Sequence, residues 1–240
     1  MLELYRLDER IAFPALDQAL DEPNGLLAFG GDLSIKRLKS AYRQGIFPWF
    51  AETEPYLWWS PSPRGIIHLE QFHCSKSLKK SLRKHNFKIT INHKFSEVIE
   101  QCALIPRNFG ANPQSDTWIT HEMQQAYIDL HHAGAASSVE VWLHDRLVGG
   151  LYGVTIGGVF CGESMFHKYT DASKIALLAL VQHMKANQLG FIDCQMNTDH
   201  LAKLGCEDVT REQFLVLLNR YKDLDVHQGV WRPQEVIIQL

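Results

Sequence analysis

The sequence has no long apolar segment and no cysteine framework, and these two absences remove several classes of protein. No stretch approaches the ~18 uninterrupted apolar residues of a membrane span, and MLELYRLDERIAF at the N-terminus lacks the basic and apolar regions of a secretion signal. The five cysteines, at positions 74, 102, 161, 194 and 206, are odd in number and widely spread. We therefore expect reduced thiols and a cytoplasmic protein that does not associate with a membrane.

Several sequence signatures of enzyme chemistry are also missing. The chain has no Cys-x-x-Cys pair and no Gly-x-x-x-x-Gly-Lys phosphate loop. HEMQQ at 121–125 is not a zinc-protease motif because Gln125 replaces the second histidine. GESMF is not a nucleophile elbow because Phe166 replaces the second glycine. We therefore expect no metal site.

One window of the chain contains no acidic residue, although the whole chain has a net charge of -3. Between Gln71 and Ser96 there is no Asp or Glu. Five basic residues in this window recur at spacings of three and four, which places them on one face of a helix: Lys76, Lys79, Lys80, Arg83 and Lys84. A solvated helix face is the alternative, but such faces usually mix both signs of charge.

Prolines, glycines and aromatic residues divide the chain into a predicted N-terminal domain, residues 1–65, and a second domain, residues 66–240. In the first domain we predict a helix from about Ile35 to Gln44, capped by Asp32 or Ser34 and stopped by Gly45. Aromatic residues then crowd around prolines in IFPWF and LWWSPSPRG. They form either a small core or a stacking platform for a nucleic-acid base.

The second domain begins with the basic helix at about 75–84, followed by a strand at 88–92, a helix at 94–103 and a loop at 105–118. A helix then runs from Thr120 to near Gly134, and three strands follow: SSVEVWL, LVGGLYGVT and VFCGESMF. The remaining predicted elements are a buried helix at about 171–189, the strand FIDCQM, a short helix in HLAKLG, an extended CEDVT and an amphipathic helix in REQFLVLLNRY.

Two carboxylates in apolar strands carry the strongest chemical signal. Glu163 and Asp193 lie among apolar neighbours, where a charge is costly unless it has a role. The alternation of strand side chains predicts that Asp193 and Gln195 lie on one face and Cys194 on the other. Each could instead be a strand-end residue with satisfied hydrogen bonds. Three such side chains on strands joined by one helix favour a site.

The order of these elements resembles the GNAT-type acyltransferase fold, in which a strand, helix and strand surround the acyl donor. In that fold a glycine-rich turn after the first of these strands holds the pyrophosphate of coenzyme A. Here the segment HKYTDASK contains no glycine. This departure indicates a different acyl carrier.

Seven motifs together resemble the bacterial leucyl/phenylalanyl-tRNA-protein transferase family: NGLLAFGGDLS, YRQGIFPWF, WWSPSPRG, TWIT, GGLYGV, FCGESMF and FIDCQ. The resemblance covers nearly the whole chain. It implies an enzyme that moves Leu or Phe from Leu-tRNA or Phe-tRNA to acceptor proteins with N-terminal Arg or Lys, marking them for degradation by the N-end rule. It also implies an α+β fold, with a small N-terminal domain and a GNAT-like catalytic domain whose mixed sheet is mostly antiparallel. We expect a monomer that needs no metal or coenzyme.

The resemblance also implies roles for individual residues. Trp49 and Trp118 would hold the terminal adenosine of the tRNA, and the five basic residues of the 75–84 helix would hold its acceptor-stem backbone. The pocket for the Leu or Phe side chain would be lined by Leu151, Phe160, Leu177 and Leu180. Hydrophobic core is the alternative interpretation of these four residues.

Attack of an α-amine on an activated ester needs orientation more than a strong base, because an α-amino pKa of about 8 makes deprotonation at pH 7 cost only ~1.4 kcal/mol. Following the family, we predict that Asp193 and Gln195 hold the amine in line with the ester carbonyl, with Asp193 polarising Gln195. Glu163 would pair with the Arg or Lys side chain of the acceptor or help to position the amine.

Two other functions stay open at this point. A coenzyme A dependent GNAT-type acetyltransferase would bind coenzyme A despite the missing turn. A non-catalytic tRNA-binding protein would keep the basic face but tolerate loss of Asp193 and Gln195. The sequence gives no interpretation for Asn108 to Asp116, and it does not predict the preference between Leu and Phe.

Overall fold

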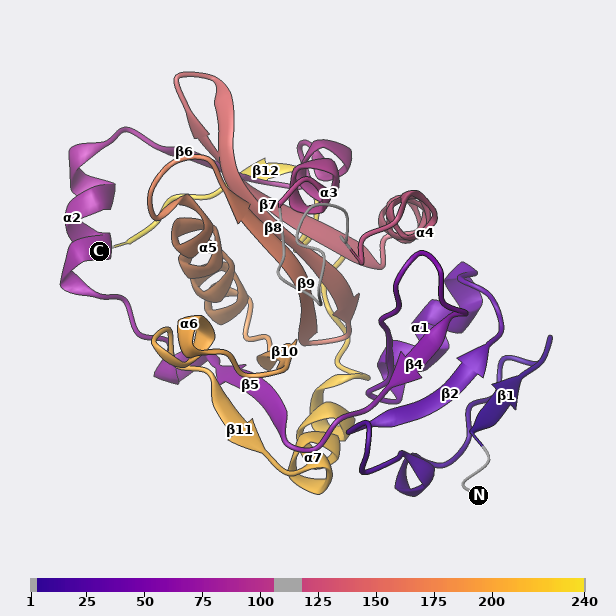
Figure 1. The fold of residues 1–240 in the computed structure, drawn as a ribbon. Coiled ribbons are helices and arrows are strands. Elements are labelled where there is room, and N and C mark those ends of the chain that lie inside the picture. Colours follow the sequence, from indigo (N-terminus) through magenta and orange to yellow (C-terminus); the bar gives the residue numbers. More distant parts are fainter. Residues whose placement is uncertain (1–3, 106–117, 240) are drawn as a thin grey trace.

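A computed structural model describes residues 4–105 and 118–239, and within them the chain forms two sheets (Figure 1). The loop predicted around Asn108 to Asp116 lies outside the described residues. The smaller sheet is built from N-terminal residues and has four strands. In spatial order they are β1 (Tyr5–Leu7), β2 (Leu26–Gly30), β4 (Leu57–Trp59) and β3 (Phe47–Pro48).

The larger sheet has eight strands among the described residues. In spatial order they are β11 (Glu207–Val209), β5 (Arg64–His68), β10 (Phe191–Gln195), β9 (Val159–His167), β8 (Arg146–Ile156), β7 (Ala136–Leu143), β6 (Lys88–Ile91) and β12 (Gln234–Glu235). All neighbouring pairs are antiparallel except β9 and β10, which are parallel. The prediction of an α+β fold with a mixed, mostly antiparallel sheet is therefore confirmed.

Helices cover both faces of the larger sheet. One hydrophobic core lies between the sheet and the helices on each face. On one face α5 (Ala172–Ala186) packs against β7, β8 and β9, and α2 (Lys76–Lys84) packs against α5. On the other face lie α1 (Ile35–Arg43), α3 (Phe95–Ala103), α4 (His121–His132) and α7 (Arg211–Tyr221). A short α6 (Asp199–Ala202) and two 3-10 helices, η1 (Leu16–Gln18) and η2 (Leu69–Gln71), complete the helical segments of the described chain.

The elements predicted from local patterns are present close to their predicted ends. Ser34 is the residue that caps α1, and its hydroxyl accepts a hydrogen bond from the backbone N of Arg37 at 3.3 Å. The predictions omitted β5, β12 and the strands of the smaller sheet. The predicted domain boundary between residues 65 and 66 stays a prediction, and β5 crosses it. Within the described residues, no helix combines the length and apolar character needed to span a membrane.

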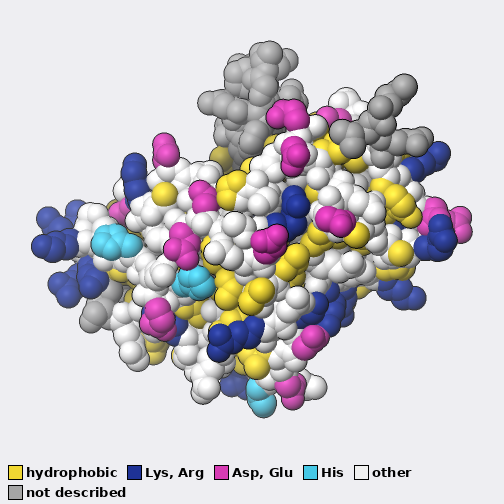
Figure 2. Space-filling view, turned by 90° about the horizontal axis from the view of Figure 1, so that it is seen from below, with side chains coloured by type: hydrophobic (Ala, Val, Ile, Leu, Met, Phe, Trp, Pro, Cys, Tyr) yellow, Lys and Arg dark blue, Asp and Glu magenta, His cyan; other side chains and the backbone are white. Residues whose placement is uncertain are grey.

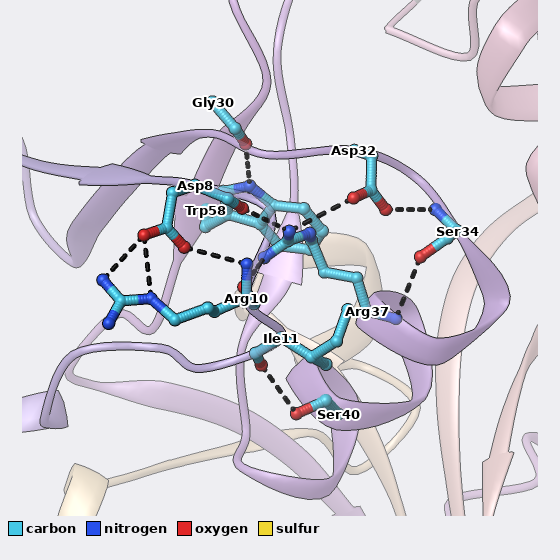
Figure 3. A network of polar contacts seen from close by, with 9 residues as sticks. All are labelled: Asp8, Arg10, Ile11, Gly30, Asp32, Ser34, Arg37, Ser40 and Trp58. Carbon is cyan, nitrogen blue, oxygen red and sulfur yellow. Dashed lines mark hydrogen bonds and ion pairs between the residues drawn. The ribbon is translucent and has the colours of Figure 1, made fainter.

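A buried arginine organises the N-terminal residues, as Figure 3 shows. The side chain of Arg37 is 0% exposed. It donates to the backbone oxygens of Asp8 at 2.7 Å and Arg10 at 3.0 Å, and it forms an ion pair with Asp32 at 3.1 Å. Gly31 has a positive φ of 79°, and a Cβ there would lie 2.9 Å from Nε of Arg37. The GGDLS motif therefore folds the N-terminal segment onto α1.

Replacing this arginine tests how much the network stabilises the fold. We expect Arg37→Met to lower the free energy of unfolding by ~2–4 kcal/mol, because the buried oxygens of Asp8 and Arg10 would lose their donors. Asp32→Asn should cost less, since the side chain of Asp32 is 49% exposed. Urea denaturation of both variants measures the difference. Equal losses would contradict this account.

Candidate active site

The site lies where β9 and β10 stop pairing. Their parallel pairing runs from Val159 and Phe191 only as far as Cys161 and Asp193. Just beyond, β9 is irregular against β8: Gly153 pairs with Gly162 and Tyr152 with Ser164, so the register skips Glu163. A second irregularity, between β10 and β5, skips Cys194. Such bulges change the direction of side chains and are common beside active sites.

An apolar cavity of about 310 Å³ opens at this point. The four predicted pocket residues, Leu151, Phe160, Leu177 and Leu180, all line it. Ile192, Met165 and Cys194 add further apolar surface. The polar side chains on its wall include Glu163, Gln195, Ser164, Thr198 and His200. An apolar cavity with a few convergent polar groups is typical of a ligand-binding site.

Both predicted tryptophans also line this cavity, and each is half-buried. The ring of Trp49 packs edge-on against Trp59 with 5.5 Å between the centroids, and the Trp59 indole N–H donates to the backbone oxygen of Trp49 at 2.7 Å. Trp118 comes from the segment just before α4. The structure therefore brings the predicted adenosine-binding residues and the predicted apolar pocket together. Their roles stay predictions.

Asp193 is not part of the cavity wall, in contrast to Gln195. Its carboxylate is 1% exposed and accepts two hydrogen bonds from Arg64, from Nε and Nη2, each at 2.8 Å. Its Oδ1 also accepts from the backbone N of Gln195 at 3.0 Å. The contact between Asp193 and Gln195 is thus made through the backbone of Gln195. The side-chain amide of Gln195 instead donates to Glu163 at 3.3 Å.

Arg64 is one of the residues beside the site that the sequence did not point to; Tyr42 and Tyr127 are two others. Its guanidinium is 1% exposed, lies 4.8 Å from the ring centre of Phe47 and 4.4 Å from that of Phe214, and donates to the backbone oxygen of Gly45 at 3.0 Å. The sequence feature that could have indicated it is an arginine in WWSPSPRG, a motif that directly precedes the apolar residues Ile66 and Ile67. An arginine there needs a buried carboxylate, and Asp193 supplies it.

A chain of phenols holds Glu163 in place. Tyr127 of α4 donates to Oε2 of Glu163 at 3.0 Å, and the hydroxyl of Tyr42 of α1 contacts that of Tyr127. Both tyrosines are buried. Burial, together with the negative charge of Glu163, raises the pKa of each phenol well above its usual value. The two hydroxyls therefore remain protonated donors at neutral pH.

The pKa of Glu163 is raised from 4.5 to about 7, chiefly because burial disfavours its charged form. Hydrogen bonds from Tyr42 and Tyr127 oppose this shift, and the charge of Asp193 adds to it. A carboxyl that titrates near neutral pH can accept or return a proton during a reaction. Among the described residues, no three His, Cys, Asp or Glu side chains group as metal ligands.

The predicted basic face lies on α2, a helix that contributes no residue to the cavity wall. Ser75 caps this helix by accepting a hydrogen bond from the backbone N of Leu78 at 3.2 Å, and Leu78 anchors the helix in the core at 1% exposure. The five basic side chains are all exposed, and none forms an ion pair with a described residue. Figure 2 shows Lys and Arg side chains gathered at the left, the side on which α2 lies in Figure 1.

The fold and the site define a class of protein with a ligand-sized apolar cavity that has a carboxyl of raised pKa on its wall. The profile of the family Leucyl/phenylalanyl-tRNA protein transferase matches residues 66–219, and the profile of that family's N-terminal domain matches residues 31–62. The chain belongs to the leucyl/phenylalanyl-tRNA protein transferase family.

Relatives of the same name extend this similarity over almost the whole chain. The leucyl/phenylalanyl-tRNA–protein transferase of Pseudoalteromonas atlantica (strain T6c / ATCC BAA-1087) is 53% identical over 239 residues, which cover 98% of this chain and 99% of the relative. That of Pectobacterium carotovorum subsp. carotovorum (strain PC1) is 50% identical over 236 residues, covering 98% of each. The solved structure of L-PGS from Bacillus licheniformis has a TM-score of 0.39 at 10% identity, and the match covers 82% of this chain and 62% of that one. A likeness this weak does not assign the fold.

Breaking the buried ion pair tests its place in the structure. We expect Arg64→Met to lower the free energy of unfolding by ~3–5 kcal/mol, because it leaves the carboxylate of Asp193 buried without a partner. Adding Asp193→Leu should recover much of this loss, since no charge then remains to be buried. Chemical denaturation of the two variants and of the wild type measures both effects. A double variant that is no more stable than Arg64→Met would contradict the interpretation.

The raised pKa of Glu163 predicts how stability depends on pH. The folded state holds its proton more tightly than the unfolded state, so stability should fall as the pH rises from 4.5 to about 7. Glu163→Gln removes this contribution. The wild type should therefore lose stability relative to Glu163→Gln across that window, and urea denaturation at several pH values measures the difference. Parallel curves for the two proteins would show that Glu163 has an ordinary pKa.

Proposed function

We propose that this protein is an aminoacyltransferase that moves Leu or Phe from aminoacyl-tRNA to the α-amine of proteins that begin with Arg or Lys. The observation that carries this proposal is the match to relatives named leucyl/phenylalanyl-tRNA–protein transferase, at about half identity over 98% of the chain. The modified proteins would enter degradation by the N-end rule. Because charged tRNA is cytoplasmic, we place the reaction in the cytoplasm, and we propose that the enzyme acts as a monomer.

The cavity supports the choice of an apolar amino acid. Its predicted lining residues Leu151, Phe160, Leu177 and Leu180 present only hydrocarbon surface, so a charged group held against these four side chains would lose its hydration without compensation from them. An apolar pocket discriminates between side chains that differ by one methylene by only ~1–3 kcal/mol. Acceptance of both Leu and Phe is compatible with such a surface.

The surroundings of the cavity support a nucleic-acid carrier. Trp49 and Trp118 at its wall provide aromatic faces on which the terminal adenosine can stack. The exposed basic residues of α2, Lys76, Lys79, Lys80, Arg83 and Lys84, provide charges for the acceptor-stem phosphates. Contacts of this kind do not depend on the tRNA sequence.

No observation favours coenzyme A as the carrier. A GNAT-like domain would place the pyrophosphate of coenzyme A at the N-terminus of α5. Here Asp171 is the N-cap residue of α5, with a positive φ of 66° and a carboxylate paired with Lys174 at 2.9 Å. A negative charge in this position opposes a pyrophosphate. We therefore propose a GNAT-like domain that has lost the coenzyme site.

In the reaction, the acceptor nitrogen attacks the ester carbonyl carbon, a C–N bond forms, and the C–O bond to the tRNA ribose breaks. Gln195 and Glu163 face the cavity and can orient the amine. Glu163, with a pKa of about 7, takes the proton that the amine releases and returns it to the departing ribose oxygen. Asp193 does not line the cavity. It fixes the backbone of Gln195 and, through Arg64, the end of β5.

Transfer assays with residue-specific variants test this assignment. Glu163→Gln should lower transfer of radiolabelled Phe from Phe-tRNA to a protein with N-terminal Arg by ~100-fold, the usual size of an acid–base contribution. Glu97→Gln, which changes a half-exposed carboxylate on α3, is the matched control and should keep wild-type transfer. The signal must disappear after ribonuclease treatment.

The same assay separates the role of Asp193 from that of Glu163. Asp193→Asn should slow transfer while leaving the affinity for Phe-tRNA nearly unchanged, because the residue positions Gln195 and does not reach the cavity. Near wild-type transfer by a folded Asp193→Asn variant would rule out this role. If the wild type gives no ribonuclease-sensitive transfer at all, the proposed function itself is wrong.

A further inference from the structure

The C-terminal strap, residues 226–239, packs against the hydrophobic core that includes the four apolar pocket residues. It pairs with β6 through β12, and the backbone N of Val236 donates to the oxygen of Ile89 at 2.9 Å. Near its end, the side chain of Gln182 in α5 makes two hydrogen bonds to the backbone of Gln239, at 2.6 and 2.9 Å. Figure 1 shows this yellow segment running from α7 to the edge of the larger sheet beside β6. The strap lies beyond residue 219, where the family profile ends.

Trp231 joins the strap to the pocket without lining it. Its ring centre lies 5.7 Å from that of Phe160 and 5.3 Å from that of the buried His183. Asn92 fixes the backbone by donating to the oxygen of Trp231 at 2.5 Å. The indole N–H is buried and has no acceptor among the described residues, so the ring is held by packing.

Phe160 transmits this contact to the cavity. It is 0% exposed and lines the cavity wall from β9. On β8, a Cβ at Gly153 would lie 2.5 Å from the ring of Phe160, so the ring lies directly over that glycine. The ring is therefore packed against the backbone of β8 and against Trp231, and it also forms part of the cavity wall.

We propose that Trp231 is a positioning residue that sets the size of the side-chain pocket through Phe160, and that the strap thereby tunes the selection between Leu and Phe. This inference rests on the proposed function. Without the indole, the ring of Phe160 can withdraw toward the strap and deepen the cavity. A deeper cavity favours the larger Phe side chain over Leu.

Binding of non-reactive analogues tests this proposal independently of catalysis. Calorimetry would measure the dissociation constants of adenosines that carry Phe or Leu through a 3′-amide bond. We expect Trp231→Leu to change the ratio of the two constants by about 5-fold or more in favour of Phe, within the range that pocket size confers. Trp231→Phe should keep nearly the wild-type ratio, because it retains an aromatic ring and removes an N–H that forms no hydrogen bond with a described residue.

Two controls separate positioning from a general loss of stability. Ile99→Ala removes core packing on α3, on the other face of the sheet, and should leave the ratio unchanged. In a Phe160→Leu background, Trp231→Leu should have no further effect on the ratio, because the mediating ring is absent. If Trp231→Leu does not fold, Trp231→Met serves the same test.

An unchanged ratio in a folded Trp231 variant would overturn the proposal, as would an equal shift in Ile99→Ala. Transfer assays of the same proteins keep the two hypotheses apart. A wild type that binds both analogues but transfers neither amino acid would contradict the proposed function. The ratio of the two dissociation constants would still test whether Trp231 sets the size of the pocket.

Discussion

The arrangement of the site depends on the buried ion pair between Arg64 and Asp193. Each side chain is 1% exposed, and the arginine also contacts the backbone of Gly45 and the rings of Phe47 and Phe214. One guanidinium thus joins β5, β10, α7 and the turn after α1. Removing two charges from water offsets much of the free energy that their attraction provides. Such a pair therefore fixes the positions of the segments that it joins more than it stabilises the fold. Here it fixes the end of β10, where Gln195 turns toward the cavity.

The irregular ends of β9 and β10 shape the polar part of the cavity wall. The register skips Glu163 on one strand and Cys194 on the other, and the wall of the cavity gains a carboxyl and an amide that touch each other. Burial raises the pKa of Glu163 to about 7, so the irregularity in β9 also brings to the cavity wall a carboxyl that titrates near neutral pH.

The candidate binding features are spread over the whole molecule, as the proposed nucleic-acid carrier requires. A nucleic-acid carrier is much larger than a coenzyme, so its binding needs surfaces far apart as well as a pocket. The aromatic residues before α4 and after α1 lie beside the cavity, whereas α2 with its basic face lies outside α5, at the left of Figure 1. The N-terminal residues reach the site, since the hydroxyl of Tyr42 in α1 contacts that of Tyr127, which donates to Glu163.

The sequence by itself determined the helices and most strands of the second domain, the mixed sheet, the family and several of the residues that line the cavity. Helix caps, glycines and hydrophobic periodicity act over a few residues, and seven motifs carried the resemblance. Only the tertiary structure decided that Asp193 pairs with Arg64, 129 residues away, and that Trp231 packs on Phe160. It also placed Glu163 at the end of a chain of phenols. These contacts join side chains from distant strands and helices, and no local pattern encodes which buried donor meets which acceptor once the sheet has formed.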